Sequence, residues 1–123
     1  MLVVDTSAWI EMLRGSMAGQ ICKTQMNSAS EILVPTIVQL ELAKFALREE
    51  GQAKADELVA YTGLLTVLVL DTAIASHAAI LSRAHKLHTT DAIIYASAQI
   101  NDAALLTCDS HFEGLAGVEY VKK

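Results

Sequence analysis

Four carboxylates of this chain stand where surface acids are not usually found, and two of them follow apolar runs. Asp5 comes directly after Leu2–Val4, and Asp109 comes two positions after Ala103–Thr107. Each run is expected to form a strand, and a parallel sheet usually carries its ligands and reactions at the carboxyl ends of its strands. Two aspartates at two strand ends therefore indicate one shared site.

The other two acids, Glu41 and Asp91, fall within apolar stripes of expected helices. Glu41 stands four residues after Ile37 and four before Phe45, so these three share one helix face. Asp91 shares its face with three apolar residues, which are Ile94, Tyr95 and Ala98. A charge within an apolar stripe is costly unless it is paired or bound to a cation.

Each acid also has a purely structural interpretation, since Glu41 can pair with Lys44 or Arg48 or reach water. Asp91 can favour the dipole of its helix, and Asp109 can cap a turn. Together the four favour a site, because the helices that follow strands begin at the same edge of the sheet. Adjacent carboxylates repel one another unless a cation compensates their charge. Oxygen ligands without a cluster of Cys or His favour Mg²⁺ or Mn²⁺ over zinc.

The composition predicts one domain over residues 1–123, with enough apolar residues (53%) to bury a core. Asp5 interrupts the first apolar run, so no secretory leader is expected. The longest apolar segment, Leu64–Leu70, is too short to cross a bilayer. Cys22 and Cys108 lack metal-ligand spacing and are expected to face the core, which suits a cytoplasmic protein.

The formal net charge of −5 argues against a protein that grips nucleic acid with a broad basic surface. If the four acids hold metal, the rest of the chain carries only about −1, and bound divalent ions reverse the sign of the site. Contacts to phosphate would then come from a few side chains. The candidates are Arg14, Lys44, Arg48, Arg83 and Lys86, with Trp9 and Tyr95 for base stacking, although Trp9 fits a place in the core equally well.

Strands are expected to alternate with helices along the chain. The expected strands are Leu2–Val4, Glu31–Val34, Leu65–Leu70, Ala103–Thr107 and Val118–Val121, and Leu65–Leu70 is expected to be buried. The expected helices are Ala8–Leu13, Ala18–Ala29, Ile37–Glu50, Ala53–Thr62, Ala73–His85 and Ala92–Ile100. The expected caps are Thr6 or Ser7, Thr36 with Gln39, Asp71, and Ser110 with Glu113. This order predicts a parallel sheet covered on both faces, an α/β sandwich.

The segments that hold the four acids resemble the PIN domain, and specifically the toxin ribonucleases of the VapC type. The matching motifs are Val3-Val4-Asp5-Thr6-Ser7, Val38-Gln39-Leu40-Glu41-Leu42-Ala43, the stretch 90–98 around Asp91, and the stretch 105–112 around Asp109. Each motif alone is weak, but the four occur in the order of the family and cover essentially the whole chain. The ordered set is what makes the resemblance specific.

The resemblance implies an α/β/α sandwich with a parallel sheet of about five strands. It also implies a metal-dependent endoribonuclease that leaves a 5′-phosphate and a 3′-hydroxyl, a homodimer, and inhibition by a cognate antitoxin in a type II toxin–antitoxin system. Some family members carry a further acid a few residues beyond the fourth. Phe112 and Glu113 stand there in this chain, which leaves Glu113 as a weak candidate ligand.

Roles for the site residues follow from the chemistry of phosphodiester hydrolysis with Mg²⁺ or Mn²⁺. Asp5 and Asp91 are expected to be the principal ligands, and Asp109 to complete their site or begin a second one. Glu41 is expected to orient a metal-bound water or to bind the ion itself. Three hydroxyl groups are expected to hydrogen-bond these ligands or their waters, and they belong to Thr6, Ser7 and Thr107.

Three other interpretations stay open. His85, His88 and His111 could cleave RNA as a histidine pair without metal. A phosphoacceptor receiver domain also carries aspartates at strand ends, but it needs paired acids after the first strand and a lysine after a late one, which this chain lacks. A catalytically silent PIN-like binding module is the more serious alternative, although such a module usually loses some of its acids.

Overall fold

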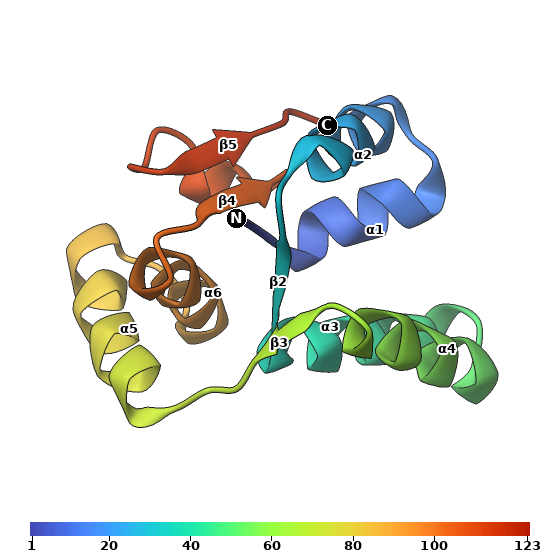
Figure 1. Ribbon diagram of the computed structural model, residues 1–123, viewed down its shortest axis with the longest axis horizontal. Helices are drawn as coiled ribbons and strands as arrows, with labels where there is room; N and C mark the ends of the chain where they lie inside the picture. Colours follow the sequence, from blue (N-terminus) through green and yellow to red (C-terminus); the bar gives the residue numbers. More distant parts are fainter.

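The apolar run Leu2–Val4 forms β1, whose three residues are all buried, and β1 lies at the centre of the sheet. The computed structural model of the chain describes residues 1–123. The sheet has five strands in the order β3-β2-β1-β4-β5, and every neighbouring pair is parallel. Figure 1 shows this sheet between two groups of helices. The predicted α/β/α sandwich with a five-stranded parallel sheet is confirmed.

Twelve elements make up the chain. The strands are β1 (Leu2–Val4), β2 (Ile32–Pro35), β3 (Thr66–Leu68), β4 (Ala104–Thr107) and β5 (Val118–Tyr120). The helices are α1 (Thr6–Arg14), α2 (Met17–Ser28), α3 (Thr36–Glu49), α4 (Gln52–Gly63), α5 (Thr72–His85) and α6 (Thr89–Ile100), and a short 3-10 helix, η1, covers Ser110–Phe112. Each predicted strand and helix is present, with ends that differ by a few residues.

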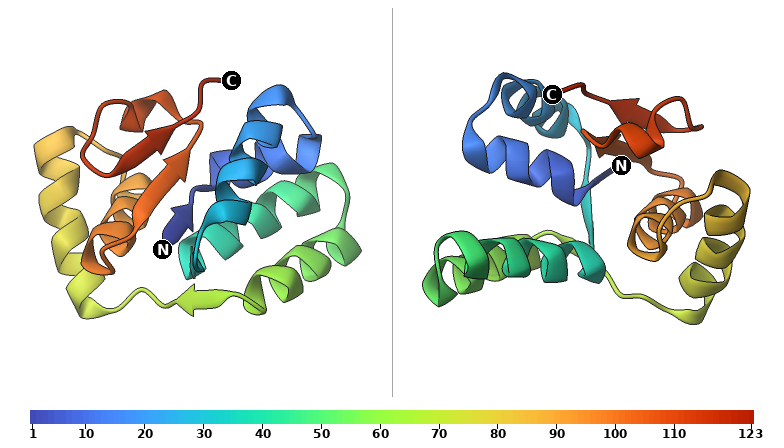
Figure 2. Two further views of the ribbon diagram at one scale, coloured as in Figure 1. Left: turned by 45° about the horizontal axis from the view of Figure 1, so that its top comes forward. Right: turned by 180° about the vertical axis from the view of Figure 1, so that it is seen from behind.

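The order of the strands explains the two layers of helices. The chain moves outward from β1 to β2 and β3, then crosses back to β4 and β5 on the other side of β1. Right-handed crossovers in opposite directions place their helices on opposite faces of a sheet. Helices α1 to α4 accordingly lie on one side of β2, and α5 and α6 lie on the other, in both the front and the back view (Figures 1 and 2).

One hydrophobic core of 26 buried residues joins the sheet to both layers. Helix α6 lies deepest in it, because the whole run from Ala92 to Ala98 is buried. Tyr95 is 1% exposed, and its hydroxyl donates a 2.6 Å hydrogen bond to the Ala116 carbonyl. Asp91, one position before this buried run, is therefore held by the most firmly packed helix of the fold.

The prediction of a buried strand over Leu65–Leu70 is wrong. The strand β3 covers only Thr66–Leu68 and forms an edge of the sheet, with β2 as its single neighbour. Val69 and Leu70, beyond its end, are 65% and 47% exposed. An apolar β-branched run shows that a strand is favoured, but it does not show whether both sides of that strand are occupied.

The helix caps predicted for α1 and α3 are both wrong. Asp5 holds the N-cap position of α1 with its backbone carbonyl, which accepts the N–H groups of Ala8 and Trp9, so Thr6 and Ser7 already lie within the helix. Pro35 stands at the N-cap of α3 without a side-chain hydrogen bond. In place of the predicted capping box of Thr36 with Gln39, the Gln39 amide donates to Thr62 Oγ1 at 3.1 Å.

Of the two later predicted caps, the one at Asp71 is confirmed and the one at Ser110 and Glu113 is wrong. Asp71 caps α5, because its Oδ1 accepts the Ile74 N–H at 2.9 Å. The predicted pair of Ser110 and Glu113 does not cap η1. Asp109 does so, since its Oδ1 accepts the His111 N–H at 2.9 Å.

The two cysteines face the core, as expected, and both are free thiols. Cys22 Sγ lies 3.5 Å from Cys108 Sγ, between α2 and the end of β4. Burial raises the pKa of the Cys108 thiol to about 12, and it raises the pKa of Cys22 as well. Neither thiol therefore has the lowered pKa that marks a reactive cysteine. None of the helices is both long and apolar enough to span a membrane.

Candidate active site

The four predicted acids line one cavity of about 350 Å³ at the carboxyl end of the central strands. Asp5 follows β1 and Asp109 comes just after β4, while Glu41 comes from the second turn of α3 and Asp91 from the first turn of α6. Parallel pairing of β1 with β4 brings the first two together, and the starts of the helices supply the others. The convergence expected from the sequence is therefore present in the fold.

Asp5 is the most deeply placed acid, at 3% exposure. Its Oδ2 accepts a hydrogen bond of 2.7 Å from Ser7 Oγ and one of 2.8 Å from Thr107 Oγ1. Burial raises the pKa of Asp5 above its usual range, although these two hydrogen bonds act in the opposite direction. Both of these side-chain hydrogen bonds reach the same oxygen of the carboxylate.

The two hydroxyl groups that hold Asp5 are themselves fixed by the backbone. Ser7 Oγ accepts the Cys108 N–H at 3.0 Å, and Thr107 Oγ1 accepts the Asp109 N–H at 3.0 Å. The hydroxyls also lie 3.2 Å from each other, but each has one hydrogen, which is already directed at Asp5. Each hydroxyl thus accepts a hydrogen bond from a backbone amide and donates one to the carboxylate of Asp5. Together they fix the orientation of that carboxylate.

Glu41 is held by a hydroxyl group at the start of α1. Thr6 Oγ1 donates a 2.6 Å hydrogen bond to its Oε1. Burial is the main cause that raises the pKa of Glu41, and the charge of Asp5 raises it further. The hydrogen bond from Thr6 and the charge of Lys44 lower this pKa. All three hydroxyl residues expected near the acids therefore contact one of them directly.

Asp91 carries the clearest electrostatic signal of the site. Burial is the main cause that raises its pKa to about 6, and the charges of three other acids add to the effect, which are Asp5, Asp109 and Glu41. The charge of His111 acts in the opposite direction. A raised pKa from carboxylates that surround one another indicates a site that favours a bound cation.

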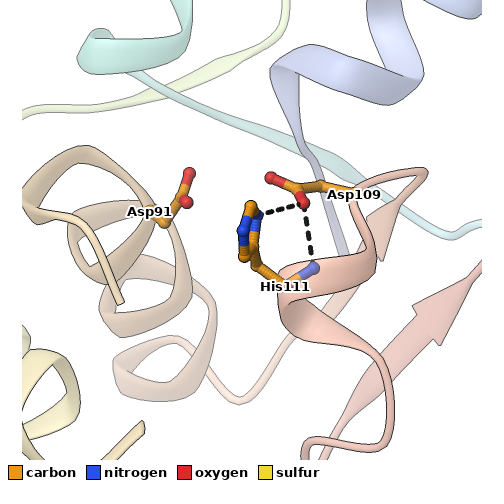
Figure 3. A group of neighbouring side chains, drawn as sticks. All are labelled: Asp91, Asp109 and His111. Atoms are coloured by element: carbon orange, nitrogen blue, oxygen red, sulfur yellow. Dashed lines mark hydrogen bonds and ion pairs between the residues drawn. The ribbon is translucent and has the colours of Figure 1, made fainter. Parts of the chain in front are cut away.

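The side chains of Asp109 and His111 lie close to that of Asp91 (Figure 3). His111 Nδ1 is 2.7 Å from Asp109 Oδ1. Asp91, Asp109 and His111 each offer one ligand atom, and these atoms all lie within 4.8 Å of one another. The sequence suggested His111 only as part of a histidine pair; in the structure its ring is 6.1 Å from that of His88, while His85 packs against Tyr95.

Glu11 is a further acid of the cavity that the sequence analysis missed. It is 6% exposed, and its carboxylate accepts hydrogen bonds from Arg14 at 3.1 Å and from Ser16 Oγ at 2.8 Å. The i,i+3 spacing of Glu11 and Arg14 is the signal that could have found this pair. Glu113, the weak candidate, is exposed and does not line the cavity.

Basic side chains border the acids on one side. Arg14 and Arg48 line the cavity, and both guanidinium groups lie over the ring of Phe45, at 5.7 Å and 5.6 Å from its centroid. Lys44 lines a smaller hollow beside them. Two other candidates for phosphate contacts, Arg83 and Lys86, do not line this cavity.

Trp9 and Tyr95 are 6% and 1% exposed, so neither presents a ring face for a base to stack on, and the prediction of base stacking on them is wrong. Lys123 adds a third basic side chain to the lining of the cavity.

The residues present fit a divalent cation. The donors of the cavity are carboxylate oxygens, with the imidazole of His111 close to Asp91 and Asp109, and oxygen ligands of this kind suit Mg²⁺ or Mn²⁺. Five carboxylates face three basic side chains there, so a cation would relieve repulsion that the protein alone leaves in place. Asp91, Asp109 and His111 offer ligand atoms that lie close together, and Asp5 and Glu41 line the same cavity.

Comparison with known proteins gives a consistent picture. The family model of the PIN domain matches residues 2–118. The chain resembles one from a toxin–antitoxin complex of Klebsiella pneumoniae at 21% identity and a TM-score of 0.83, covering 100% of this chain and 99% of that one. It also resembles VapC20 of Mycobacterium tuberculosis, a toxin that cleaves the sarcin–ricin loop, at 19% identity, a TM-score of 0.81, and coverage of 98% and 99%.

A third similar structure is the DNA-bound VapBC complex of Salmonella typhimurium, at 21% identity, a TM-score of 0.72, and coverage of 97% and 96%. No curated protein sequence matches the chain. Similarity at these identities establishes the fold. The match of the family model over residues 2–118 also establishes the family to which the chain belongs.

Proposed function

The chain belongs to the PIN domain family, and from that premise we propose that it is a metal-dependent endoribonuclease of the VapC type, the toxin of a type II toxin–antitoxin system. The observation that carries the proposal is the convergence of Asp5, Glu41, Asp91 and Asp109 on one cavity. The raised pKa of about 6 at Asp91 supports it, because burial and then the charges of the neighbouring acids disfavour its carboxylate form unless a cation binds.

The residues of the cavity divide the work of phosphodiester hydrolysis. A bound Mg²⁺ or Mn²⁺ supplies a water of lowered pKa and compensates charge on the phosphoryl oxygens. Asp5 and Asp91 would hold the ion, and Asp109 would complete its site. Glu41, which is oriented by Thr6, positions the attacking water. Ser7 and Thr107 keep the carboxylate of Asp5 turned toward the cavity.

Arg14 and Arg48 are the residues best placed to hold the RNA. Both border the acids, and stacking on Phe45 restricts the positions of their guanidinium groups. A guanidinium held in this way can bind a backbone phosphate in a defined direction. The −5 net charge of the chain is then no obstacle, because the contact to phosphate is local.

The proposal extends to partners and setting. The similar structures from Klebsiella pneumoniae and Salmonella typhimurium are toxin–antitoxin assemblies, which supports a cognate antitoxin for this chain. We include in the proposal a homodimer, a cytoplasmic setting and a single domain over residues 1–123.

The experiment is cleavage of a mixed cellular RNA pool, with an RNA of the sarcin–ricin loop beside it, in Mg²⁺, in Mn²⁺ and with EDTA. The expected result is a set of discrete products that need metal and vanish with Asp5→Asn. Mapping their ends gives the substrate. Cleavage that resists EDTA would favour the histidine pair, and a folded, inhibitor-free protein that cleaves nothing in any metal would favour the silent binding module.

A further inference from the structure

His111 is the one nitrogen donor beside the acids of the cavity. Its ring lies between the side chains of Asp91 and Asp109 (Figure 3). One ligand atom from each of these three residues lies within 4.8 Å of the others. Because the metal site itself belongs to the proposed function, an inference about His111 rests on that proposal and refines it.

The spacing of His111 and Asp109 suits two ligands of one ion. His111 Nδ1 and Asp109 Oδ1 are 2.7 Å apart, which is a hydrogen bond while a proton lies between them. Two neighbouring ligands of an octahedral ion, each about 2.1 Å from it, lie about 3 Å apart. A cation can therefore replace that proton with movements of only a few tenths of an ångström.

Asp109 holds His111 in this position. The same Asp109 oxygen also accepts the His111 backbone N–H at 2.9 Å, so the side chain and the backbone of His111 are tied to one atom. The ring of His88 meets that of His111 edge to face, with centroids 6.1 Å apart. His111 is exposed to solvent, so no large rearrangement is needed for an ion to reach it.

We propose that His111 is a metal ligand of this site, and that its nitrogen makes the site prefer a first-row transition dication over Mg²⁺. Imidazole nitrogen binds transition ions well, whereas Mg²⁺ takes oxygen ligands and keeps much of its water. The four acids alone would suit Mg²⁺. With His111 included, the donor set is mixed oxygen and nitrogen, and the site discriminates between the two ions.

The test uses Mn²⁺ as the probe, because its electron spin reports directly on coordinated nitrogen. Tag-free protein is loaded with Mn²⁺ and examined by pulsed electron paramagnetic resonance for coupling to ¹⁴N. Wild type is expected to show this coupling, and His111→Gln is expected to lose it. His88→Gln is the matched control, since its ring is adjacent to His111 but lies outside the group of ligand atoms.

Calorimetric titration of the same proteins with Mn²⁺ and Mg²⁺ tests the selectivity. His111→Gln is expected to weaken Mn²⁺ binding about tenfold, within the range seen when metal sites lose a supporting group, while Mg²⁺ binding changes less. Circular dichroism confirms that the variants are folded.

The outcomes separate this inference from the proposed function. Mn²⁺ that binds without nitrogen coupling, or with the same coupling in His111→Gln, would overturn the role of His111 and leave the carboxylate site intact. Equal losses for Mn²⁺ and Mg²⁺ in His111→Gln would overturn the claimed selectivity. A wild-type protein that binds neither ion would overturn the metal site, and the proposed function with it.

Discussion

Thr107 and Asp5 are 102 positions apart in the chain, yet the Thr107 hydroxyl donates a 2.8 Å hydrogen bond to Asp5 Oδ2. The same hydroxyl accepts the Asp109 N–H at 3.0 Å. One buried side chain at the end of β4 therefore joins the two acids that follow the central strands. This link sets the distance between them and the direction in which the Asp5 carboxylate faces the cavity.

Replacing Thr107 tests whether that link serves the site. Thr107→Val keeps the shape of the side chain but leaves the Asp109 N–H without its acceptor, so metal affinity is expected to fall about 10- to 100-fold. Stability should fall by about 1–3 kcal/mol, the cost of buried polar groups left unpaired. Thr107→Ser retains the hydroxyl and should stay near wild type in both. Calorimetric titration with Mn²⁺ and urea denaturation measure the two effects; a Val variant that binds Mn²⁺ as wild type does would contradict the role.

The raised pKa of Asp91 predicts how the stability of the metal-free protein changes with pH. Its pKa is about 6 in the folded protein and about 3.9 in an unfolded chain. Between these values the folded state holds a proton that the unfolded state has released, so the free energy of unfolding falls as pH rises through that window. Asp5 and Glu41 also have raised pKa values and act in the same direction.

Urea denaturation in EDTA should therefore give a higher free energy of unfolding at pH 5 than at pH 7.5. Asp91→Asn, which cannot ionise at this position, should reduce the difference between the two pH values. Saturating Mn²⁺ at pH 7.5 should stabilise wild type more than the variant, because a ligand that binds only the folded state adds to stability. Wild-type protein that becomes more stable from pH 5 to pH 7.5 without metal would contradict the crowding of the acids.

Three of the four acids could be predicted from the sequence because they follow parallel strands or lie early in a helix that does. Asp5 and Asp109 come after β1 and β4, Glu41 lies in the second turn of the helix after β2, and parallel strands bring such positions to one edge. Asp91 begins α6, which follows another helix, and the apolar residues on its helix face are what indicated that it points inward.

The same reasoning did not predict that His111 and Glu11 lie at the site. His111 reaches Asp91 only through the short turn of η1, and Glu11 faces inward because Ser16 and Arg14 hold its carboxylate. Local hydrogen bonds of this kind leave no periodic pattern to detect.

The hydroxyl residues illustrate a second limit. Thr6 and Ser7 satisfy the usual preference for an N-cap, but their hydroxyls bind Glu41 and Asp5 in place of the helix backbone. The prediction that these hydroxyls lie near the acids is therefore confirmed, whereas the prediction that one of them caps α1 is wrong. A residue that can serve two partners is assigned only when the competing partner is seen in three dimensions.

Arg48 should contribute to RNA binding through a backbone phosphate. Its guanidinium lies beside the acids and over Phe45, and its own ion pair with Glu49 is exposed. Arg48→Gln is expected to weaken RNA binding and to lower the slope of log affinity against log salt by about 0.7, the value for one contact to a single strand. Arg83→Gln removes the same charge far from this cavity and is the control. Both arginine substitutions are made in the inactive Asp5→Asn protein, so that RNA is bound without being cleaved. Binding is then measured by fluorescence anisotropy.

An unchanged salt slope in Arg48→Gln, or an equal change in Arg83→Gln, would contradict a local contact to phosphate. The second result would favour a diffuse effect of net charge in its place. Arg14→Gln is less informative as a first test, because Arg14 also pairs with the buried Glu11.

The buried thiols should be silent toward thiol reagents in the folded protein. Cys22 and Cys108 are both fully or nearly fully buried, and the pKa of Cys108 is raised to about 12. The thiolate is the reactive form, so labelling at pH 8 should proceed only when the chain opens. The expected result is no label in native buffer and two labels per chain in denaturant. Rapid labelling of the native protein would contradict the packing of α2 against the end of β4.

The junction between α1 and α2 supplies the last prediction, because it positions Glu11 and Arg14 from outside the cavity. Ser16 caps α2 by accepting the Gly19 N–H at 3.0 Å and donates to Glu11 Oε1 at 2.8 Å. Gly19 lies so close to α1 that a Cβ there would overlap the Glu11 carbonyl. Gly19→Ala must therefore separate the two helices.

The expected cost of Gly19→Ala is about 1–3 kcal/mol in the free energy of unfolding, as for other substitutions that overfill a packed contact. Gly63→Ala is the matched control, because a Cβ at Gly63, the last residue of α4, meets nothing within 4 Å. Urea denaturation of both variants measures the difference. If the close approach of the helices also sets the position of Glu11, Gly19→Ala should reduce RNA cleavage at temperatures where it is still folded. Equal stability of the two alanine variants would show that α1 and α2 are not in tight contact.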